Sequence, residues 1–433
     1  MRICASLNSL EEKDEIGKAD MVEIRLDLLD DVPDISSKDM IVTYRGDIDL
    51  SILPDGFDGL IDVGENEPPS GMNVISSHHN FIDTPDCSEI ISILDKIRGD
   101  VAKGAFTVNT FTDLHNIHRA ATSMRKKHVI LGMGEMGTIT RIREKILGNE
   151  FTFAYVRKPT APGQLSLDVM DSLRDDCIVT GIVGYPLSRS LSPMMHGAAM
   201  KDSNINGIYL KFETDNLEHI GDVIREYDIR GLNVTTPHKE NIIKHLDCID
   251  KDASEISAVN TIVNDDGTLR GYNTDVLGVD KALTMSEYST KGGNALVMGY
   301  GGAARACVYH LLKNGCGVTI VGRNDSKASD FSKSFGCEWI SKSNILLERY
   351  DLIVNSTPAG MYGSSDYPMN IDKLTSNHTV FDMVYGGTPL TEKAKNVGSK
   401  IAYGEDMLAA QGSASFELWT GVKNTFDVMR GCL

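Results

Sequence analysis

The chain has no apolar run close to the roughly 20 residues that a membrane-spanning helix needs, so we expect no transmembrane segment. Its eight cysteines are scattered without a CxxC pair, which argues against a zinc site or a disulfide scaffold. Residues 1–6 contain no basic region followed by a long apolar stretch, and we therefore expect no secretory signal and a cytoplasmic protein. Internal repeats and low-complexity segments are also absent.

Positive charge is scarce, with 43 Lys and Arg residues against 61 Asp and Glu residues and a net charge of −18. Such a chain should be repelled by nucleic acids and anionic membranes, so we expect neither as a partner. We expect small anionic substrates instead, bound where positive charge gathers locally. The 433 residues, 41% of them hydrophobic and 24% charged, are ordinary for a soluble protein of two to four domains.

The first part of the chain alternates short apolar runs with helical or loop stretches. Eight such runs predict a (β/α)8 barrel that ends near Leu173. Because this is short for such a barrel, some connections must be minimal, and residues 45–60 are too few and too rich in Asp, Gly and Pro to hold a full helix. The predicted strands are Ile3–Leu7, Met21–Asp27, Met40–Arg45, Gly59–Val63, Asn73–His79, Ala102–Val108, Val129–Met133 and Phe153–Val156.

Two further α/β patterns follow a short linker at Arg174–Cys177. One begins at Ile178, and the other begins at Ala295 with a strand, a glycine-rich turn, a helix and a second strand. A last helix near Met407–Met429 is expected to fold back on the earlier of the two patterns. The elements predicted after the linker are the strands Ile178–Gly184, Gly207–Phe212 and Gly231–Val234 and the helices Pro193–Ser203 and Leu217–Tyr227.

The glycine-rich turn has the pattern of a dinucleotide site. An apolar strand leads into Gly299-Tyr-Gly301-Gly302-Ala303-Ala304, and an apolar-periodic helix follows. Gly299 permits the tight turn, Gly301 lets the backbone approach a pyrophosphate, and Ala304 lets the helix pack close to the strand. The phosphates would lie at the helix N-terminus. The alternative is a plain glycine-rich turn.

The end of the next strand, Gly317–Val321, favours NADP over NAD. An NAD site usually has an Asp or Glu there for the ribose hydroxyls, whereas this chain has Arg323, with Lys327 four residues on. Two cations suit a 2′-phosphate. A solvated basic turn is the alternative, although it is less expected in so acidic a chain.

Charged side chains occur inside two strands of the predicted barrel. Glu23, Arg25 and Asp27 alternate along one strand, so they share a face, and barrel strands are normally apolar on both faces. Lys103 likewise stands in an apolar strand, where lost hydration favours the neutral amine that can form a Schiff base. The pattern therefore indicates a polar site inside the barrel. An exposed edge strand and a surface lysine are the alternatives.

The region from Ile178 to Leu433 resembles the shikimate dehydrogenase family. Besides the nucleotide motif, four motifs occur in the family's order: GYPLSRSLSP at 184–193, NVTTPHK at 233–239, AVNT at 258–261 and NTD at 273–275. The resemblance implies that Lys239 and Asp275 form the catalytic dyad, with Lys239 giving a proton to the alkoxide that hydride transfer creates. It implies further that the substrate is held by Ser190 and Ser192 at its carboxylate, by Thr235, Asn260 and Gln411 at its hydroxyls, and by Tyr385 nearby.

Three shorter matches extend this resemblance into the cofactor site. They are NSTPAGM at 355–361, DMVY at 382–385 and MLAAQ at 407–411. With them the resemblance implies cofactor contacts from Thr357, Met361 and Gly404, in addition to those of the glycine-rich turn. The family often has Asn-Arg-Thr after the second nucleotide strand, where this chain has Gly322-Arg323-Asn324, so Asn324 is a departure at the expected 2′-phosphate contact.

Residues 1–173 resemble type I 3-dehydroquinate dehydratase. After Glu23-x-Arg25-x-Asp27 come TYR at 43–45, SHHNF at 77–81, Lys103, TR at 140–141 and APGQ at 161–164. The resemblance implies that Lys103 forms an imine with the substrate ketone, that His79 moves the C2 proton and that Glu23 orients His79. Arg141 would pair with the substrate carboxylate, and the other implied contacts are Arg25, Arg45, Thr160 and Gln164. His78 is a competing base, but the residues after His79 match the family better.

Two departures qualify the match of this first region. The loop after Arg45 is shorter than in bacterial members, and Asp49 is the one counterpart for a glutamate that those members have near the imine. Asn80 follows the expected catalytic histidine where the family usually has Asp. Either difference would change loop closure or lower the activity.

The product of the first implied reaction, 3-dehydroshikimate, is the substrate of the second. We therefore expect a bifunctional α/β enzyme with a (β/α)8 barrel at 1–174 and a two-lobed dehydrogenase that has a substrate domain at 178–276, joined by 405–433, and a Rossmann-type NADP domain at 277–404. The alternatives are a catabolic NAD-linked quinate/shikimate dehydrogenase, an active dehydrogenase fused to an inactive or regulatory barrel, and a non-enzymatic binding protein. A homo-oligomer is compatible with the sequence. No metal-ligand cluster is evident.

Overall fold

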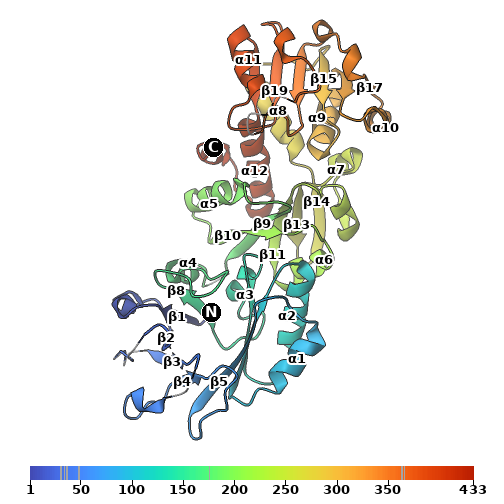
Figure 1. Ribbon diagram of the computed structural model, residues 1–433. Helices are drawn as coiled ribbons and strands as arrows, with labels where there is room; N and C mark the ends of the chain where they lie inside the picture. The colour runs from blue at the N-terminus through green and yellow to red at the C-terminus, as the bar shows by residue number, and fades with distance from the viewer. Residues whose placement is uncertain are drawn as a thin grey trace. The chain divides into compact units, whose positions relative to one another are not determined.

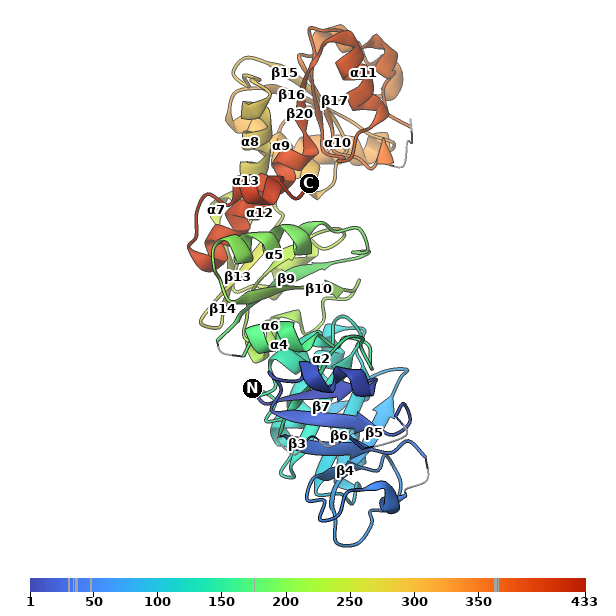
Figure 2. The ribbon, with the colours of Figure 1, turned by 90° about the vertical axis from the view of Figure 1, so that its left-hand side faces the viewer.

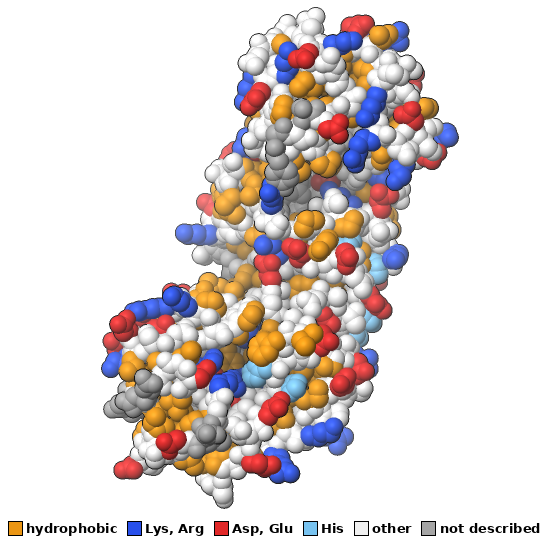
Figure 3. All heavy atoms as spheres, viewed as in Figure 1, with side chains coloured by type: hydrophobic (Ala, Val, Ile, Leu, Met, Phe, Trp, Pro, Cys, Tyr) orange, Lys and Arg blue, Asp and Glu red, His pale blue; other side chains and the backbone are white. Residues whose placement is uncertain are grey.

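The computed structural model describes residues 1–29, 32–33, 35, 38–46, 49–174, 176–361, 364 and 366–433 (Figure 1). The chain forms two compact units, Met1–Leu187 with Ile205–Arg230, and Ser188–Asn204 with Gly231–Leu433. Every helix of the described residues is too short or too polar to span a bilayer. On the face that Figure 3 shows, acidic and basic side chains are interspersed.

The first unit begins with eight parallel strands in a nearly closed barrel, which confirms the predicted fold. The strand order is β7-β6-β5-β4-β3-β2-β1-β8, and the ends approach each other where the amide of Glu150, just before β8, donates to His128 O in β7 at 3.0 Å. The strands are β1 (Ile3–Leu7), β2 (Met21–Arg25), β3 (Asp39–Thr43), β4 (Leu60–Asp62), β5 (Asn73–Asn80), β6 (Val101–Thr107), β7 (His128–Met133) and β8 (Thr152–Tyr155).

Short connections explain how so small a barrel forms. Between β3 and β4 the described residues hold one 3-10 helix, η2 (Leu50–Ile52), as the composition of that loop predicts. The other connecting helices are η1 (Leu10–Glu15), α1 (Cys87–Asp95), α2 (Phe111–Ser123) and α3 (Thr138–Ile142), and α4 (Leu167–Ser172) follows the last strand. α2 begins with a capping box in which Thr110 and Asp113 satisfy each other's backbone amides.

The barrel interior changes from apolar to charged along the strands. Its apolar floor includes Cys4, Met21, Ile41, Ile75, Val101 and Phe153. Since side chains alternate along a strand, positions two residues further on face the same interior. Five of these positions carry Ser6, Glu23, Thr43, Ser77 and Lys103, all of them buried. The polar site that the sequence predicts therefore lies above an apolar layer.

A mixed six-stranded sheet has the order β10-β9-β11-β13-β14-β12. Its strands are β9 (Ile178–Gly184), β10 (Gly207–Glu213), β11 (Ile229–Val234), β12 (Cys248–Ile249), β13 (Thr261–Asp265) and β14 (Thr268–Tyr272), and its helices are α5 (Ser192–Asp202), α6 (Ile220–Glu226), α7 (Lys251–Ile256) and the 3-10 helix η3 (Asn241–His245). β13 and β14 form a hairpin whose two-residue turn, Asp266-Gly267, has positive φ angles of 47° and 88°.

The third sheet has the strand order β17-β16-β15-β18-β19-β20, which is the Rossmann order, and all its strands are parallel. Side chains of α8, α9 and α10 pack on one face and those of α11 on the other. Figure 2 shows the ribbons of α8 and α11 on opposite sides of this sheet. The strands are β15 (Asn294–Met298), β16 (Gly317–Val321), β17 (Glu338–Trp339), β18 (Leu352–Asn355), β19 (Thr379–Asp382) and β20 (Lys400–Tyr403), and the helices are α8 (Asp275–Met285), α9 (Gly302–Lys313), α10 (Asp325–Phe335) and α11 (Pro389–Val397).

The C-terminal segment differs from its prediction. Instead of one helix over 407–429 it forms α12 (Gly404–Thr420) and α13 (Phe426–Arg430). The break falls at Gly421, which caps α12 with a left-handed φ of 75°. Both helices pack against α5.

We predict opposite effects from two glycine-to-alanine changes. At Gly231 in β11 a Cβ would lie 2.1 Å from Trp419 Nε1 and 2.3 Å from Ile262 O, two atoms that hydrogen-bond to each other. Gly231→Ala should therefore lower the free energy of unfolding by about 1–3 kcal/mol. The matched change Gly197→Ala, at an exposed site in α5 with no atom near the new Cβ, should raise it by about 0.5–1 kcal/mol.

Urea denaturation followed by far-UV circular dichroism measures both changes. Equal midpoints for Gly231→Ala and the unchanged protein would mean that the Trp419 side chain moves aside without cost.

Candidate active sites

All eight residues that the sequence assigns to the first site line one cavity of about 240 Å³ inside the barrel. Apolar side chains of Phe81, Leu131, Met133 and Phe153 complete the wall. The eight residues lie on β2, β5, β6 and α3 and in the loops that follow β3 and β8. The eight are Glu23, Arg25, Arg45, His79, Lys103, Arg141, Thr160 and Gln164.

Lys103 is buried at the centre of this site, between two carboxylates. Its Nζ lies 2.9 Å from Asp62 Oδ2 and 4.0 Å from Glu23 Oε1, and 4.4 Å from the centre of the Phe153 ring. Burial raises the pKa of Asp62, but the charges of Lys103 and Arg45 and the hydrogen bond from Lys103 outweigh burial and lower that pKa to about 2. Asp62 was missed in the sequence, although a carboxylate inside the otherwise apolar run Leu60–Val63 was a signal.

The structure separates the two competing histidines. His79 lines the cavity with Lys103, whereas His78, on the opposite face of β5, turns its Nδ1 to Glu65 Oε1 at 2.8 Å and lines a different cavity. Burial of His79, together with the charges of Lys103 and Arg45, lowers its pKa to about 3. The imidazole is therefore neutral near pH 7 and can accept a proton.

Glu23 makes contacts other than the expected one with His79. Its carboxylate accepts hydrogen bonds from Ser6 Oγ at 2.5 Å and Thr43 Oγ1 at 2.8 Å, both on neighbouring strands. Among the described residues no contact joins Glu23 to His79. The carboxylate of Glu23 is bound instead by the hydroxyl groups of the two flanking strands and lies near Lys103. Arg25 is held in the cavity wall by a bidentate pair with Asp27 at 2.7 and 2.5 Å.

Arg141 has the features of an anion binder. It is buried, its Nε has no hydrogen-bond partner among the described residues, and burial lowers its pKa to about 10 despite the charge of Glu23. Nearby, Gln164 Oε1 accepts from the Thr160 amide at 2.7 Å and so shapes the loop after β8. Gly163 is required in this loop, since its φ is 77° and a Cβ would lie 2.2 Å from Gly134 O.

The two departures from the family pattern both lie in turns. The carboxylate of Asp49 caps η2 by accepting from the amide of Ser51, and it does not line the cavity. Asn80 fixes the turn after β5 by accepting from the amides of Ile82 and Asp83. Residues 47 and 48 of the shortened loop lie outside the described residues.

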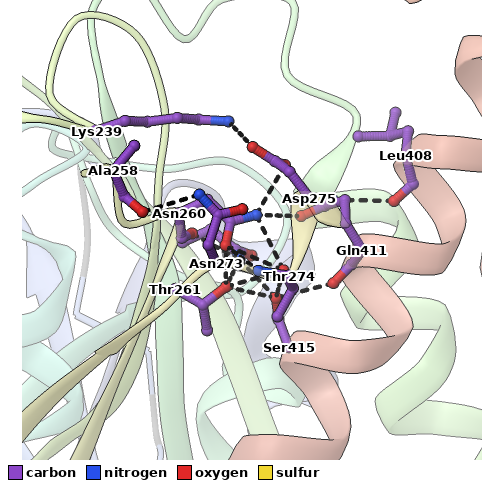
Figure 4. Close-up of polar contacts among 11 residues, drawn as sticks. Lys239, Ala258, Asn260, Thr261, Asn273, Thr274, Asp275, Leu408, Gln411 and Ser415 are labelled. Atoms are coloured by element: carbon purple, nitrogen blue, oxygen red, sulfur yellow. Dashed lines mark hydrogen bonds and ion pairs between the residues drawn. The ribbon is translucent and has the colours of Figure 1, made fainter. Parts of the chain in front are cut away.

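The second site is built around Lys239 and Asp275 (Figure 4). Lys239 Nζ donates to Asp275 Oδ2 at 2.5 Å, and Asn260 Nδ2 donates to Asp275 Oδ1 at 2.8 Å, so each carboxylate oxygen has a donor. Asp275 is the first residue of α8, where the helix dipole favours a negative charge. Gln411 of α12 reaches the same cluster, its Oε1 accepting from Asn260 Nδ2 at 3.3 Å.

A layer of hydroxyl groups holds Asn260 in place. The amide of Thr274 donates to Asn260 Oδ1 at 2.7 Å, as does Thr261 Oγ1 at 3.0 Å. Ser415 Oγ lies 2.8 Å from Thr261 Oγ1 and accepts from Asn233 Nδ2 at 3.0 Å. The supporting role of Ser415 was missed in the sequence, because it depends on α12 returning to β11 and β13.

Other predicted substrate residues lie at the ends of neighbouring elements. Ser192 begins α5 and its amide donates to Ser190 Oγ at 3.4 Å. Thr235 follows β11, and its carbonyl accepts from the His238 amide at 2.9 Å. Tyr385 is partly exposed in the segment after β19. No hydrogen bond among the described residues joins Ser190, Ser192 or Thr235 to Lys239 or Asp275 themselves.

The glycine-rich turn has the predicted strand–turn–helix form. Gly299 has a φ of 114°, and a Cβ there would lie 2.6 Å from Ser356 Oγ, at the point where the strand order reverses between β15 and β18. Gly301 is the N-cap of α9, with open space around its Cα. A Cβ on Gly302 would lie 2.9 Å from Lys239 Cδ. Ala303 follows in the first turn, and Ala304 is fully buried.

The remaining predicted cofactor residues surround this turn. Arg323 and Lys327 are exposed after β16, while Asn324 has its side chain engaged as the N-cap of α10. Thr357 Oγ1 donates to Asn355 Oδ1 at 2.7 Å in the loop after β18, and Met361 is partly exposed. Gly404 begins α12, where a Cβ would lie 2.7 Å from Met383 O, so close packing alone requires glycine there.

Comparison with known proteins matches four family models along the chain. Residues 47–175 match type I 3-dehydroquinase, 182–262 the shikimate dehydrogenase substrate-binding domain, 281–373 shikimate/quinate 5-dehydrogenase and 404–431 the shikimate 5′-dehydrogenase C-terminal domain. The shikimate dehydrogenase (NADP(+)) of Methanococcus maripaludis is 39% identical over 58% of this chain and 95% of that relative.

Two solved structures are similar as well. The shikimate dehydrogenase of Aquifex aeolicus aligns with a TM-score of 0.57 and 34% identity over 59% of this chain and 97% of its own. The dehydroquinate dehydratase and shikimate dehydrogenase from S. pombe AroM covers 100% of this chain and 98% of its own, with a TM-score of 0.51. At 23% identity that likeness shows a shared fold.

These matches account for both regions in which the structure gathers reactive side chains. The chain belongs to the shikimate dehydrogenase family, and it carries a type I 3-dehydroquinase domain ahead of its dehydrogenase region.

Proposed function

We propose that this chain converts 3-dehydroquinate to 3-dehydroshikimate in the barrel and then reduces 3-dehydroshikimate to shikimate with NADPH. The observation that carries the proposal is the cavity around buried Lys103, which is lined by every residue that the sequence assigns to an imine-forming dehydratase. The pairing of Lys239 with Asp275 supports the second reaction. The net charge of −18 argues against nucleic acid as a partner.

In the barrel, Lys103 attacks the C3 ketone as the neutral amine, and loss of the carbonyl oxygen as water leaves a protonated imine. The imine withdraws electrons from C2, so neutral His79 can remove the C2 proton. His79 then returns a proton to the C1 hydroxyl, which leaves as water, and hydrolysis of the imine frees Lys103. The vacant donor of buried Arg141 supports a bidentate contact with the substrate carboxylate.

In the dehydrogenase region, Lys239 donates a proton to the oxygen that becomes negative as the carbonyl is reduced. Asp275 and Asn260 hold the lysine in position, and Ser190 and Ser192 bind the carboxylate. The bound reduced cofactor supplies the hydride. Arg323 and Lys327 suit the 2′-phosphate of NADP, and the NADP(+) named for the Methanococcus maripaludis relative supports this choice.

We further propose domain boundaries at 1–174, 178–276 with 405–433, and 277–404, and a cytoplasmic location. The start of α12 at Gly404 and the hydrogen bonds of Gln411 and Ser415 with β11–β14 residues support the return of the C-terminal segment to the substrate domain.

The two active sites should be separable by single substitutions. Lys103→Met should abolish shikimate formation from 3-dehydroquinate and NADPH but leave reduction of 3-dehydroshikimate within about twofold. Lys239→Ala should do the opposite, so that 3-dehydroshikimate accumulates, and should lower reduction by at least about 100-fold, the scale of a lost proton donor. NADPH absorbance with chromatographic detection of shikimate follows both.

Borohydride with 3-dehydroquinate should add mass to the unchanged protein at Lys103 and none to Lys103→Met. Dehydration that survives in Lys103→Met would contradict the imine mechanism. An unchanged protein that reduces 3-dehydroshikimate without dehydrating 3-dehydroquinate would leave the barrel as an inactive module.

The lowered pKa of His79 predicts that the rate of the dehydratase reaction stays nearly constant as the pH falls from 7 to 5. With a pKa of about 3 in the folded protein, His79 stays neutral at pH 5, so kcat at saturating substrate, which follows proton removal after the imine has formed, should change by less than about twofold between pH 7 and pH 5. An ordinary histidine base with a pKa of about 6.5 would lose about 20-fold in the same interval. Initial rates of dehydroquinate consumption across this range distinguish the two.

The assay needs a check on folding, because below about pH 6.5 His79 binds a proton more readily in the unfolded state than in the folded state. The contribution of neutral His79 to stability is therefore present above about pH 6.5 and is lost as the pH falls toward 3. Circular dichroism at each pH separates unfolding from titration.

Cofactor preference should depend on the exposed cations after β16. Replacing both Arg323 and Lys327 by alanine should lower kcat/KM for NADPH by at least about 100-fold, since each of the two charge-assisted contacts contributes about 1.5–3 kcal/mol when formed, and should alter kcat/KM for NADH by less than about threefold. Lys333→Ala, in the last turn of the same helix α10, is the matched control. Equal losses with both cofactors would contradict a 2′-phosphate site.

A further inference from the structure

Five titratable side chains meet where α2 packs on α6, outside both active sites. His115 and His118 are three residues apart on α2, while Asp222 and Glu226 are four apart on α6 and follow His219, the N-cap of that helix. Such spacings place the side chains of each helix on one face. We call these five residues the histidine cluster. All of them belong to the first compact unit.

Three members of the cluster already have the proximity of metal ligands. One ligand atom each of His115, His219 and Asp222 lies within 4.8 Å of the other two. The rings of His115 and His219 stack with centroids 4.3 Å apart, and His219 Nδ1 lies 2.9 Å from Asp222 Oδ2. Glu226 is beside them, with Oε1 2.8 Å from His115 Nδ1 and 3.6 Å from His118 Nδ1.

Buried polar atoms in the cluster lack hydrogen bonds. Three buried atoms have no hydrogen-bond partner among the described residues: His115 Nδ1, His118 Nδ1 and Glu226 Oε2. Although His115 Nδ1 lies close to Glu226 Oε1, the two atoms are not aligned for a hydrogen bond. Neighbouring buried atoms of this kind require an explanation such as a bound ion. A third carboxylate, Glu218, lies 4.0 Å from His219 Nε2, so the surroundings favour a cation.

We propose that the histidine cluster binds a divalent transition metal of the zinc class. His115, His219 and Asp222 are the ligands, with Glu226 either completing a tetrahedral set or holding His115 from behind. Zinc–nitrogen bonds of about 2.0–2.1 Å separate tetrahedral ligands by about 3.3 Å, so the stacked rings must turn about their Cβ–Cγ bonds to aim their lone pairs at the ion. His219, with a third of its side chain exposed, has room to turn.

The donor set determines the class of metal. Imidazole nitrogens with one or two carboxylates suit zinc, cobalt or nickel, whereas calcium and magnesium prefer oxygen ligands throughout. The bound ion would join α2, which lies in the predicted barrel domain, to α6, which lies in the predicted substrate domain. We therefore assign it a structural role, and it takes part in neither reaction.

Zinc titration of the full chain tests the proposal. Protein stripped with a chelator should bind one Zn²⁺, measured by calorimetry, and Co²⁺ should give the visible absorption of a low-symmetry nitrogen–oxygen site. His115→Ala, Asp222→Asn and His219→Asn should each weaken Zn²⁺ binding by at least about tenfold. Asparagine is chosen at 219 because the φ of that residue is 60°, a conformation that asparagine tolerates.

Two control variants separate this site from adventitious binding. His245→Ala removes a histidine outside the cluster, and Cys248→Ser removes an exposed thiol, so both should bind Zn²⁺ as the unchanged protein does. The cluster variants should keep both enzymatic activities, which shows that they fold. Absence of binding to the unchanged protein, or binding that survives in the three cluster variants, would overturn the proposal.

Discussion

Successive side chains along a β-strand point to opposite faces, and this alternation decides which residues can meet inside the barrel. Parallel backbone hydrogen bonding fixes the register, pairing Ser77 with Lys103 across β5 and β6. A shift of the β5 register by one residue would place His78 in the cavity in place of His79. The positions of Lys103, its carboxylate partners and His79 therefore depend together on strand register, and the apolar floor beneath them depends on the same register.

The charged side chains that this register buries are better explained by a role in the proposed reaction than by a contribution to the stability of the fold. Taking Lys103, Asp62, Glu23 and Arg141 out of water costs more than their mutual attraction usually returns. Lys103 faces two carboxylates, yet among the residues that the structure describes the buried Nε of Arg141 has no hydrogen-bond partner. In the proposed reaction, the carboxylate of the substrate would supply that partner. On the proposed function, the free donor of Arg141 serves substrate binding, and its cost to stability is of the kind that functional sites carry.

Patterns local in sequence were sufficient for most of the fold. Alternating apolar runs predicted eight barrel strands, and the glycine-rich turn predicted the Rossmann β-α unit that begins at β15. The contacts that could not be predicted join residues far apart in the chain. Glu23 turns to Ser6 and Thr43 and away from His79, Ser415 supports Asn260 from a returning helix, and His115 meets His219 and Asp222 across two helices. The helix break at Gly421 was local, but continuous apolar periodicity concealed it.

Gly302 illustrates how one position can serve two sites. In a dinucleotide turn a glycine is usually explained by close approach to phosphate. Here the first residue of α9 also lies against the stem of Lys239, where a Cβ would come within 2.9 Å of Cδ. The ammonium of the same lysine is held by Asp275. Because the Lys239 side chain is bound at its tip and confined along its stem, a shift of the glycine-rich turn must move Lys239, the proposed proton donor, or strain its bond to Asp275. In the proposed mechanism, the position of the cofactor and the delivery of the proton are therefore linked through Gly302.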